Sequence, residues 1–181
     1  MERNLTLIAL FAALIAALGL IPSFTLAFGV PITAQSMGVM LCGTVLGAKR
    51  GGLAALLFVV LVALGLPLLA GGRGGLGVFA SPTVGFLISF PIGAFVTGLL
   101  VEKLRFGSLG VVAAAASVVG GVIVVYIFGV IGMSVVLDKT IPEATLLVTA
   151  FIPGDLIKAI AAGAITVALY KARPNSVLSR A

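Results

Sequence analysis

Residues 4–48 read NLTLIALFAALIAALGLIPSFTLAFGVPITAQSMGVMLCGTVLGA, 45 consecutive residues without an Asp, Glu, Lys or Arg. Further uncharged stretches cover residues 51–72, 74–101 and 106–137. Each stretch exceeds the ~20 apolar residues that cross a bilayer as a helix. The chain of 181 residues is 61% hydrophobic and 9% charged, whereas soluble domains carry about 25% charged residues. We therefore predict an all-α membrane protein with a single transmembrane domain over residues 1–181.

The composition also excludes several kinds of chemistry. The chain has no histidine and one cysteine, Cys42. It therefore has no intrachain disulfide, no histidine metal site and no imidazole for acid–base catalysis. No GxxxxGK(S/T) motif occurs, so the chain cannot hydrolyse ATP through a P-loop. The net charge of +6 is spread along the chain rather than clustered, so we expect no nucleic-acid partner. We also expect no catalytic residue, metal or cofactor.

Prolines, glycines and charges divide the uncharged stretches into six expected membrane-spanning helices. Pro22 and Pro31 flank a short turn, and residues 71–77 (GGRGGLG) are too rich in glycine for a regular helix. Ser81 and Pro82 predict an N-cap followed by proline in the first helical position, with a kink expected later at Pro91. The expected helices are residues 5–21, 32–48, 51–70, 82–101, 107–137 and 153–170.

Three details of these helices stay open. The first 20 residues also suggest a signal peptide, but their apolar core is long and no clear cleavage site follows, so we expect a retained helix. The glycine-rich stretch 107–137 is longer than a span and is expected to tilt, bend or extend outside the membrane. The last helix is expected to begin at Pro153, after a surface or re-entrant segment over 144–154; the alternative begins near Thr145 and breaks at Pro153.

Basic residues predict the orientation of the bundle. Six helices place both termini on one side of the membrane, and the side richer in Lys and Arg is cytoplasmic. Eight basic residues fall on the side of the termini against two, Arg73 and Lys139, on the other. The eight are Arg3, Lys49, Arg50, Lys103, Arg105, Lys171, Arg173 and Arg180. We therefore expect cytoplasmic termini.

Asp155 and Lys158, in the sequence IPGDLIK, are ionisable residues within a predicted span. Such residues are costly in a membrane and usually face a cavity or each other. Their i, i+3 spacing places both on one helix face, and the helix dipole stabilises ionised Asp155 in the first turn. A neutralising pair that caps the helix is the alternative. We favour a functional pair, because buried ion pairs add little stability.

Arg73 is the only charge between Arg50 and Glu102, and residues 71–77 around it include five glycines, among them Gly74. Glycine lets the backbone approach a ligand closely, which makes Arg73 and Gly74 candidate ligand contacts. A flexible loop whose arginine meets lipid phosphate remains the alternative. The segment formally matches GxGxxG, but it lacks the βαβ context of a nucleotide site.

Small residues form a ridge on the first expected helix. Ala9, Ala13 and Ala17 recur every four residues, which lets another helix approach closely. The ridge is either a docking face for a partner or a packing face within the bundle. Spacing alone slightly favours packing.

Two blocks of sequence carry a resemblance to a known family. GGRGGLGVFASPTVGFLISFPIGAF (71–95) and FIPGDLIKAIAAG (151–163) resemble the BioY family, the biotin-binding S components of energy-coupling-factor (ECF) transporters. The resemblance covers essentially the whole chain. It implies a multi-pass protein of the bacterial cytoplasmic membrane that binds biotin outside and delivers it to the cytoplasm with a transmembrane coupling protein and cytoplasmic ATPase subunits. It also implies that Ala9, Ala13 and Ala17 contact the coupling protein.

The chemistry of biotin fits the candidate residues. Its ureido ring has two N–H donors and one carbonyl acceptor, and its flexible chain ends in a carboxylate. Ionised Asp155 can accept from the ureido N–H groups, while Lys158 and Arg73 can each bind the ureido carbonyl or the carboxylate. Further candidates are aromatic side chains that sandwich the rings and one amide donor. These are Phe79, Phe86, Phe90, Tyr126 and Gln35.

Four alternatives to a biotin-binding S component remain at this stage. The first is an S component for another vitamin, and the second is a solitary biotin carrier of the kind reported within the family. A membrane enzyme that uses Asp155 as a base is a third alternative, without support elsewhere in the sequence. A small channel is disfavoured, because no span carries the repeated polar face that a water-filled pore requires.

Overall fold

The computed structural model describes residues 2–26 and 29–180, which are mostly helical. The two short strands β1 (Phe24–Thr25) and β2 (Pro31–Ile32) pair antiparallel between the first two helices. The α-helices are α1 (Glu2–Leu18), α2 (Gln35–Leu46), α3 (Ala48–Ala63), α4 (Val84–Lys103), α5 (Leu109–Ser117), α6 (Val125–Val136), α7 (Ile141–Val148) and α8 (Ile152–Ala172). Shorter helical turns are η1 (Leu76–Ala80), the π-helical segment η2 (Val118–Val124), η3 (Thr149–Phe151), η4 (Pro174–Ser176) and η5 (Leu178–Arg180).

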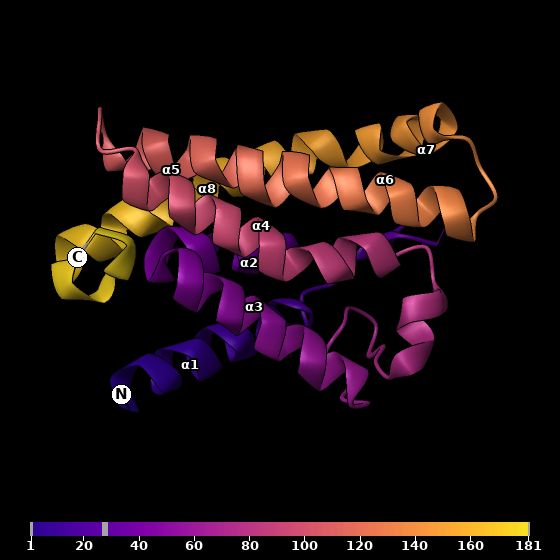
Figure 1. The fold of residues 1–181 in the computed structure, drawn as a ribbon, viewed down its shortest axis with the longest axis horizontal. Helices are drawn as coiled ribbons and strands as arrows, with labels where there is room; N and C mark the ends of the chain where they lie inside the picture. The colour runs from indigo at the N-terminus through magenta and orange to yellow at the C-terminus, as the bar shows by residue number, and fades with distance from the viewer. Residues whose placement is uncertain (1, 27–28, 181) are drawn as a thin grey trace.

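The helices form an elongated bundle with both chain termini near one end (Figure 1). Within residues 2–26 and 29–180, three helices are long and apolar enough to cross a membrane: Val84–Lys103, Leu109–Val136 and Ile141–Ala172. The second runs through α5, η2 and α6, and the third through α7, η3 and α8. The fold is therefore mostly helical, and the length and hydropathy of these helices are those of a multi-pass membrane protein.

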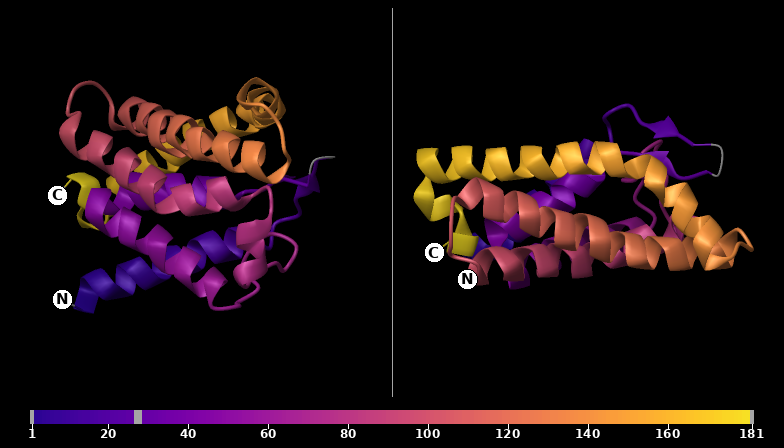
Figure 2. Two further views of the ribbon diagram at one scale, coloured as in Figure 1. Left: turned by 45° about the vertical axis from the view of Figure 1, so that its right-hand side comes forward. Right: turned by 90° about the horizontal axis from the view of Figure 1, so that it is seen from above.

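Helix α2 lies in the centre of the bundle. Ten of its twelve residues are buried, because α1, α3, α4 and α8 pack around it (Figures 1 and 2). Glycine allows this close packing: a Cβ atom at Gly43 would lie 2.5 Å from the carbonyl oxygen of Ala94 on α4. Small residues are the usual means by which membrane helices approach one another.

Several helix ends differ from the sequence predictions: α1 ends at Leu18 instead of residue 21, and α2 spans Gln35–Leu46 instead of 32–48. Two further ends have a clear local cause. α3 ends at Ala63 instead of residue 70, because Gly65 adopts a φ of +105° and Pro67 has no backbone N–H to continue the helix. The chain then folds back through a loop over residues 64–75. α4 begins at Val84, and the hydroxyl of Ser81 donates to the carbonyl oxygen of Val78 (2.6 Å) instead of capping α4.

The last helical segment combines features of both interpretations: it is helical from Ile141 to Ala172, and the turn η3 breaks it just before Pro153. α8 starts at Ile152, so Pro153 lies in its first turn, where the missing N–H is tolerated. The preceding residues are also helical, as α7 and η3, and this segment is bent relative to α8 (Figure 2, right). The join places Asp155 in the first turn of α8 and therefore at the edge of the bundle interior.

The long glycine-rich helix is interrupted by the π-helical segment η2, which contains Gly120 and Gly121. A Cβ atom at Gly121 would lie 2.5 Å from the side chain of Met40, so this glycine lets α2 and η2 touch. π-helical turns often occur at functional sites. Here the segment leads directly into Val125 and Tyr126, which line the cavity described next.

Candidate ligand-binding site

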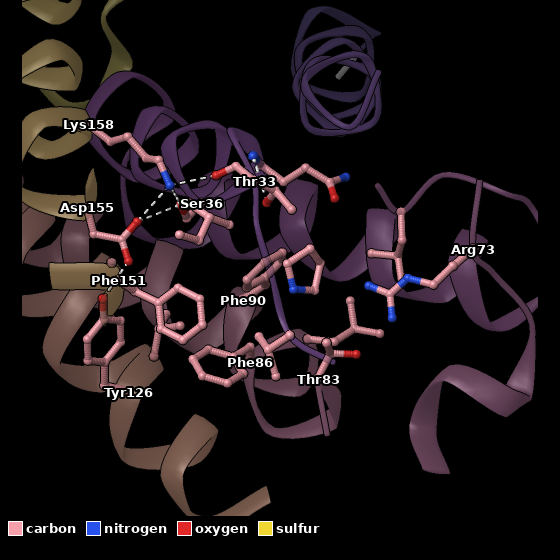
Figure 3. Close-up of a pocket in the computed structure, with 18 residues that line it drawn as sticks. Thr33, Ser36, Arg73, Thr83, Phe86, Phe90, Tyr126, Phe151, Asp155 and Lys158 are labelled. Atoms are coloured by element: carbon pink, nitrogen blue, oxygen red, sulfur yellow. Dashed lines mark hydrogen bonds and ion pairs between the residues drawn. The ribbon is translucent and has the colours of Figure 1, made fainter. Parts of the chain in front are cut away.

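A cavity lies among the first turns of α2, α4 and α8 (Figure 3). These turns lie in the half of the bundle away from the chain termini (Figure 1). Strand β2, the loop that carries Arg73, and α6 complete its walls. The polar residues that line it are Thr33, Gln35, Ser36, Arg73, Thr83, Tyr126, Asp155 and Lys158.

Asp155 and Lys158 form the ion pair that their spacing predicted, at one end of the cavity. Lys158 Nζ lies 2.9 Å from Asp155 Oδ1 and also donates to Ser36 Oγ (3.1 Å) and to the carbonyl oxygen of Thr33 (2.6 Å). Asp155 accepts further hydrogen bonds from Ser36 Oγ (3.1 Å) and from the hydroxyl of Tyr126 (2.6 Å). We call Ser36, Tyr126, Asp155 and Lys158 the polar tetrad.

Asp155 is buried, whereas Ser36, Tyr126 and Lys158 are half-buried, and all four side chains are hydrogen-bonded. Asp155 is 6% exposed. Its ion pair with Lys158 is the only one among the described residues. Burying a charge is costly unless it is paired and hydrogen-bonded, and Asp155 has both an ion pair and hydrogen bonds from two hydroxyls. The arrangement provides a carboxylate acceptor and an ammonium donor at fixed positions, which suits a ligand with adjacent N–H and carbonyl groups.

Arg73 extends into the opposite side of the cavity (Figure 3). Gly71 and Gly72 take left-handed φ angles of +77° and +70°, which closes a tight turn between Leu69 and Arg73. Arg73 Nε donates to the carbonyl oxygen of Ala70 (3.3 Å). Within residues 2–26 and 29–180, its two terminal nitrogens have no hydrogen-bond partner. The half-buried guanidinium is therefore free to bind an anionic group.

Aromatic rings lie between the tetrad and Arg73 (Figure 3). Phe86 makes edge contacts with Tyr126 (ring centroids 6.3 Å apart) and with Phe151 (6.0 Å). Phe90 on α4 completes the apolar wall. Edge-to-face aromatic pairs are rigid, apolar surfaces. They suit a flat, apolar ring between two polar ends.

Three sequence candidates are placed less favourably for ligand contact. Gln35 borders the cavity, but its amide nitrogen donates to the carbonyl oxygens of Ile15 (3.1 Å) and Leu68 (3.0 Å), so it ties α1 to a loop. Gly74 and Phe79 are not among the described residues that line the cavity. A Cβ atom at Gly74 would collide with the carbonyl oxygen of Leu66, which explains this glycine by packing.

Sequence reasoning missed Ser36, Thr33 and Phe151. Ser36 stands 119 residues from Asp155, and no local pattern predicts that these two side chains meet. Phe151 directly precedes the Ile152–Pro153 pair that opens α8. Its place beside the IPGDLIK sequence was the one available signal.

Comparison with known proteins identifies the family. A model described as the BioY family matches residues 2–175. The chain belongs to the BioY family.

Two relatives and one solved structure illustrate the extent of this similarity. The chain is 51% identical over 189 residues to the biotin transporter BioY of Rhodobacter capsulatus, covering 99% of this chain and 100% of the relative. It is 52% identical over 166 residues to the biotin transporter BioY of Rhizobium etli, covering 88% and 89% of the two chains. The crystal structure at 2.1 Å of the S-component for biotin from an ECF-type ABC transporter matches with a TM-score of 0.88 and 34% identity, over 94% of this chain and 92% of that chain. The BioY relatives are named as transporters, and none of these names describes an enzyme.

Proposed function

We propose that this chain is the biotin-binding S component of a biotin transporter, and that biotin is its transported substrate. The observation that carries the proposal is the cavity with the polar tetrad at one end, the free guanidinium of Arg73 at the other and aromatic rings between them. Biotin has the same order of groups: a hydrogen-bonding ureido ring, an apolar thioether ring and a chain that ends in a carboxylate.

We assign one end of biotin to each end of the cavity. The ureido N–H groups donate to Asp155, replacing a hydroxyl of Ser36 or Tyr126, and the ureido carbonyl accepts from Lys158. The carboxylate binds the terminal nitrogens of Arg73, because arginine can hold a carboxylate with two parallel hydrogen bonds. Lys158 is the weaker candidate for the carboxylate, since its charge is already paired with Asp155.

Titration of the purified chain with biotin tests this proposal. The double variant Asp155→Ala and Lys158→Ala is expected to lose biotin binding. The matched control, Lys139→Ala with Glu143→Ala, also removes one base and one acid, but from exposed positions outside the cavity. Competition with other vitamins identifies an S component of different specificity. Undiminished binding by the first double variant refutes the proposed site.

We propose that six helical segments cross the bacterial cytoplasmic membrane as one transmembrane domain over residues 1–181, with cytoplasmic termini. The termini lie near one end of the bundle, and Lys49, Lys103 and Lys171 lie at the helix ends nearest to them, as the positive-inside rule requires (Figure 1). Single cysteines at residues 26 and 104, in a Cys42→Ala background, test the orientation. Labelling of residue 104 from outside would reverse it.

We further propose that α1 docks on a transmembrane coupling protein. Ala9, Ala13 and Ala17 are exposed, whereas Ala12 and Ile15 on the same helix are buried in the core. The small-residue ridge therefore faces away from the bundle, which supports docking over internal packing. Cytoplasmic ATPase subunits then supply the energy. Purification of the tagged chain from its own cells tests this: recovery without a coupling protein would favour a solitary carrier.

A further inference from the structure

A second hollow lies on the outer surface of the bundle, between α3 and α4. It is shallow and widely open, and apart from Lys49 its lining residues are apolar. We call it the α3–α4 groove; its lining residues are Lys49, Gly52, Leu53, Leu56, Pro91, Ile92 and Phe95. α4 separates it from the ligand cavity, because Phe90 lines the cavity whereas the adjacent Pro91 lines the groove.

The shape of the groove follows from one glycine. Gly52 has no side chain, and a Cβ atom there would lie 3.3 Å from both Phe95 Cβ and the carbonyl oxygen of Pro91. The walls stand above this floor: Leu53 is 50% exposed and Leu56 is 45% exposed. Both leucines lie on α3, and the opposite wall (Pro91, Ile92 and Phe95) lies on α4, which is long and apolar enough to cross a membrane. An acyl chain is the natural occupant of such a surface.

Lys49 supplies the only charge along the groove. It is exposed in the first turn of α3, and it forms no ion pair with any carboxylate in the described part of the chain. The carboxylate of Glu102 instead accepts from the backbone N–H of Ala48 (2.9 Å). A free cation at the end of an apolar groove is complementary to a molecule with an anionic head and an apolar tail.

A second copy of the chain fits this surface less well. In a twofold dimer the same patch meets itself. Such an interface would bring two unpaired Lys49 side chains to one apolar contact without a counter-ion, and charged residues are depleted at interface cores.

We propose that the α3–α4 groove binds an anionic phospholipid, with its phosphate at Lys49 and one acyl chain along Gly52, Leu56 and Phe95. Basic pockets between membrane helices on the cytoplasmic side bind anionic head groups in this way. The groove is separate from the ligand cavity, because the two share no lining residue.

Native mass spectrometry of the detergent-purified chain tests the proposal, with phosphatidylglycerol and phosphatidylcholine of identical acyl chains as probes. One lysine near the membrane surface should favour the anionic lipid about fivefold. Lys49→Ala should remove this preference and Lys49→Arg should keep it. Lys171→Ala, which removes an exposed lysine outside the groove, is the matched control and should leave the preference unchanged.

Leu53→Trp fills the groove from an exposed position and should weaken retention of both lipids. Thermal unfolding of each variant shows that its fold is intact. Equal retention of the two lipids by the wild type would overturn the proposal. So would an equal loss of preference in Lys49→Ala and Lys171→Ala, or a dimer whose doubled mass disappears in Leu53→Trp.

Discussion

Arg73→Ala should weaken the binding of biotin without weakening the fold. In the structure, the guanidinium makes one long hydrogen bond (3.3 Å) to the carbonyl oxygen of Ala70, and its terminal nitrogens have no partner among the described residues. Little stability is therefore lost with the side chain, and the thermal unfolding midpoint should move by no more than a few degrees. What is lost is the group that we assign to the carboxylate of biotin.

The size of the effect follows from the strength of hydrogen bonds to charged groups. These contribute about 1.5–3 kcal/mol, or roughly 13-fold to 160-fold in affinity at about 1.36 kcal/mol per tenfold. Arg73 is only half-buried, so solvent screening favours the lower part of this range, roughly 10-fold to 50-fold. The structure therefore predicts a clear loss of affinity rather than its abolition, because the polar tetrad still holds the ureido ring.

Isothermal titration calorimetry with biotin and with biotinamide distinguishes the loss of a carboxylate contact from a general disturbance of the cavity. The chain contains no tryptophan, so calorimetry is preferable to intrinsic fluorescence. The wild type should prefer biotin over its neutral amide, and Arg73→Ala should bind both about equally. Arg173→Ala, at an exposed position outside the cavity, is the control. If Arg73→Ala loses as much affinity for biotinamide as for biotin, Arg73 does not bind the carboxylate.

Three further predictions concern the tetrad, the packing and the docking face. Asp155→Asn should destabilise the chain to thermal unfolding, by up to the roughly 3–5 kcal/mol of a broken buried ion pair, and the added Lys158→Met change should restore stability but not biotin binding. Gly98→Ala should lower stability by about 1–3 kcal/mol or more, since its Cβ would collide with the backbone where α2 meets α3. Gly154→Ala, with open space around it, should be neutral or stabilising by up to about 1 kcal/mol in the same unfolding assay. Ala13→Phe should abolish copurification of the coupling protein while calorimetry shows unchanged biotin affinity; retained copurification would place docking elsewhere.

Much of the fold was predictable because hydropathy and helix spacing are local properties. Uncharged stretches located the helices, and the i, i+3 spacing of Asp155 and Lys158 predicted their ion pair. The prediction was wrong at the end of the expected helix over 51–70. The helix ends at Ala63, because Gly65 and Pro67 break it although the residues around them are apolar. The number of helices that cross the membrane remains a proposal, since three meet the criteria of length and hydropathy.

The candidate site was predictable only in part, because it joins residues that are distant in the chain. Phe86 and Arg73 do line the cavity, yet Gln35 is committed to backbone carbonyls and Gly74 to close packing. A side chain that binds a ligand and one that ties two segments together look the same in a sequence. Their roles differ through the groups that other segments bring to them.

The amino-acid order was sufficient for the membrane class, the helical architecture, the distribution of positive charge and the pairing of Asp155 with Lys158. These properties depend on the transfer of short segments from water to lipid and on the geometry of one helix. The three-dimensional packing was needed to bring Ser36 and Tyr126 to Asp155, across 119 and 29 residues, and to place Arg73 opposite them. Which helix faces meet depends on the fit of their side chains and on glycines at close helix crossings, such as Gly43. These contacts join segments that are far apart in the chain, so no local sequence pattern predicts them.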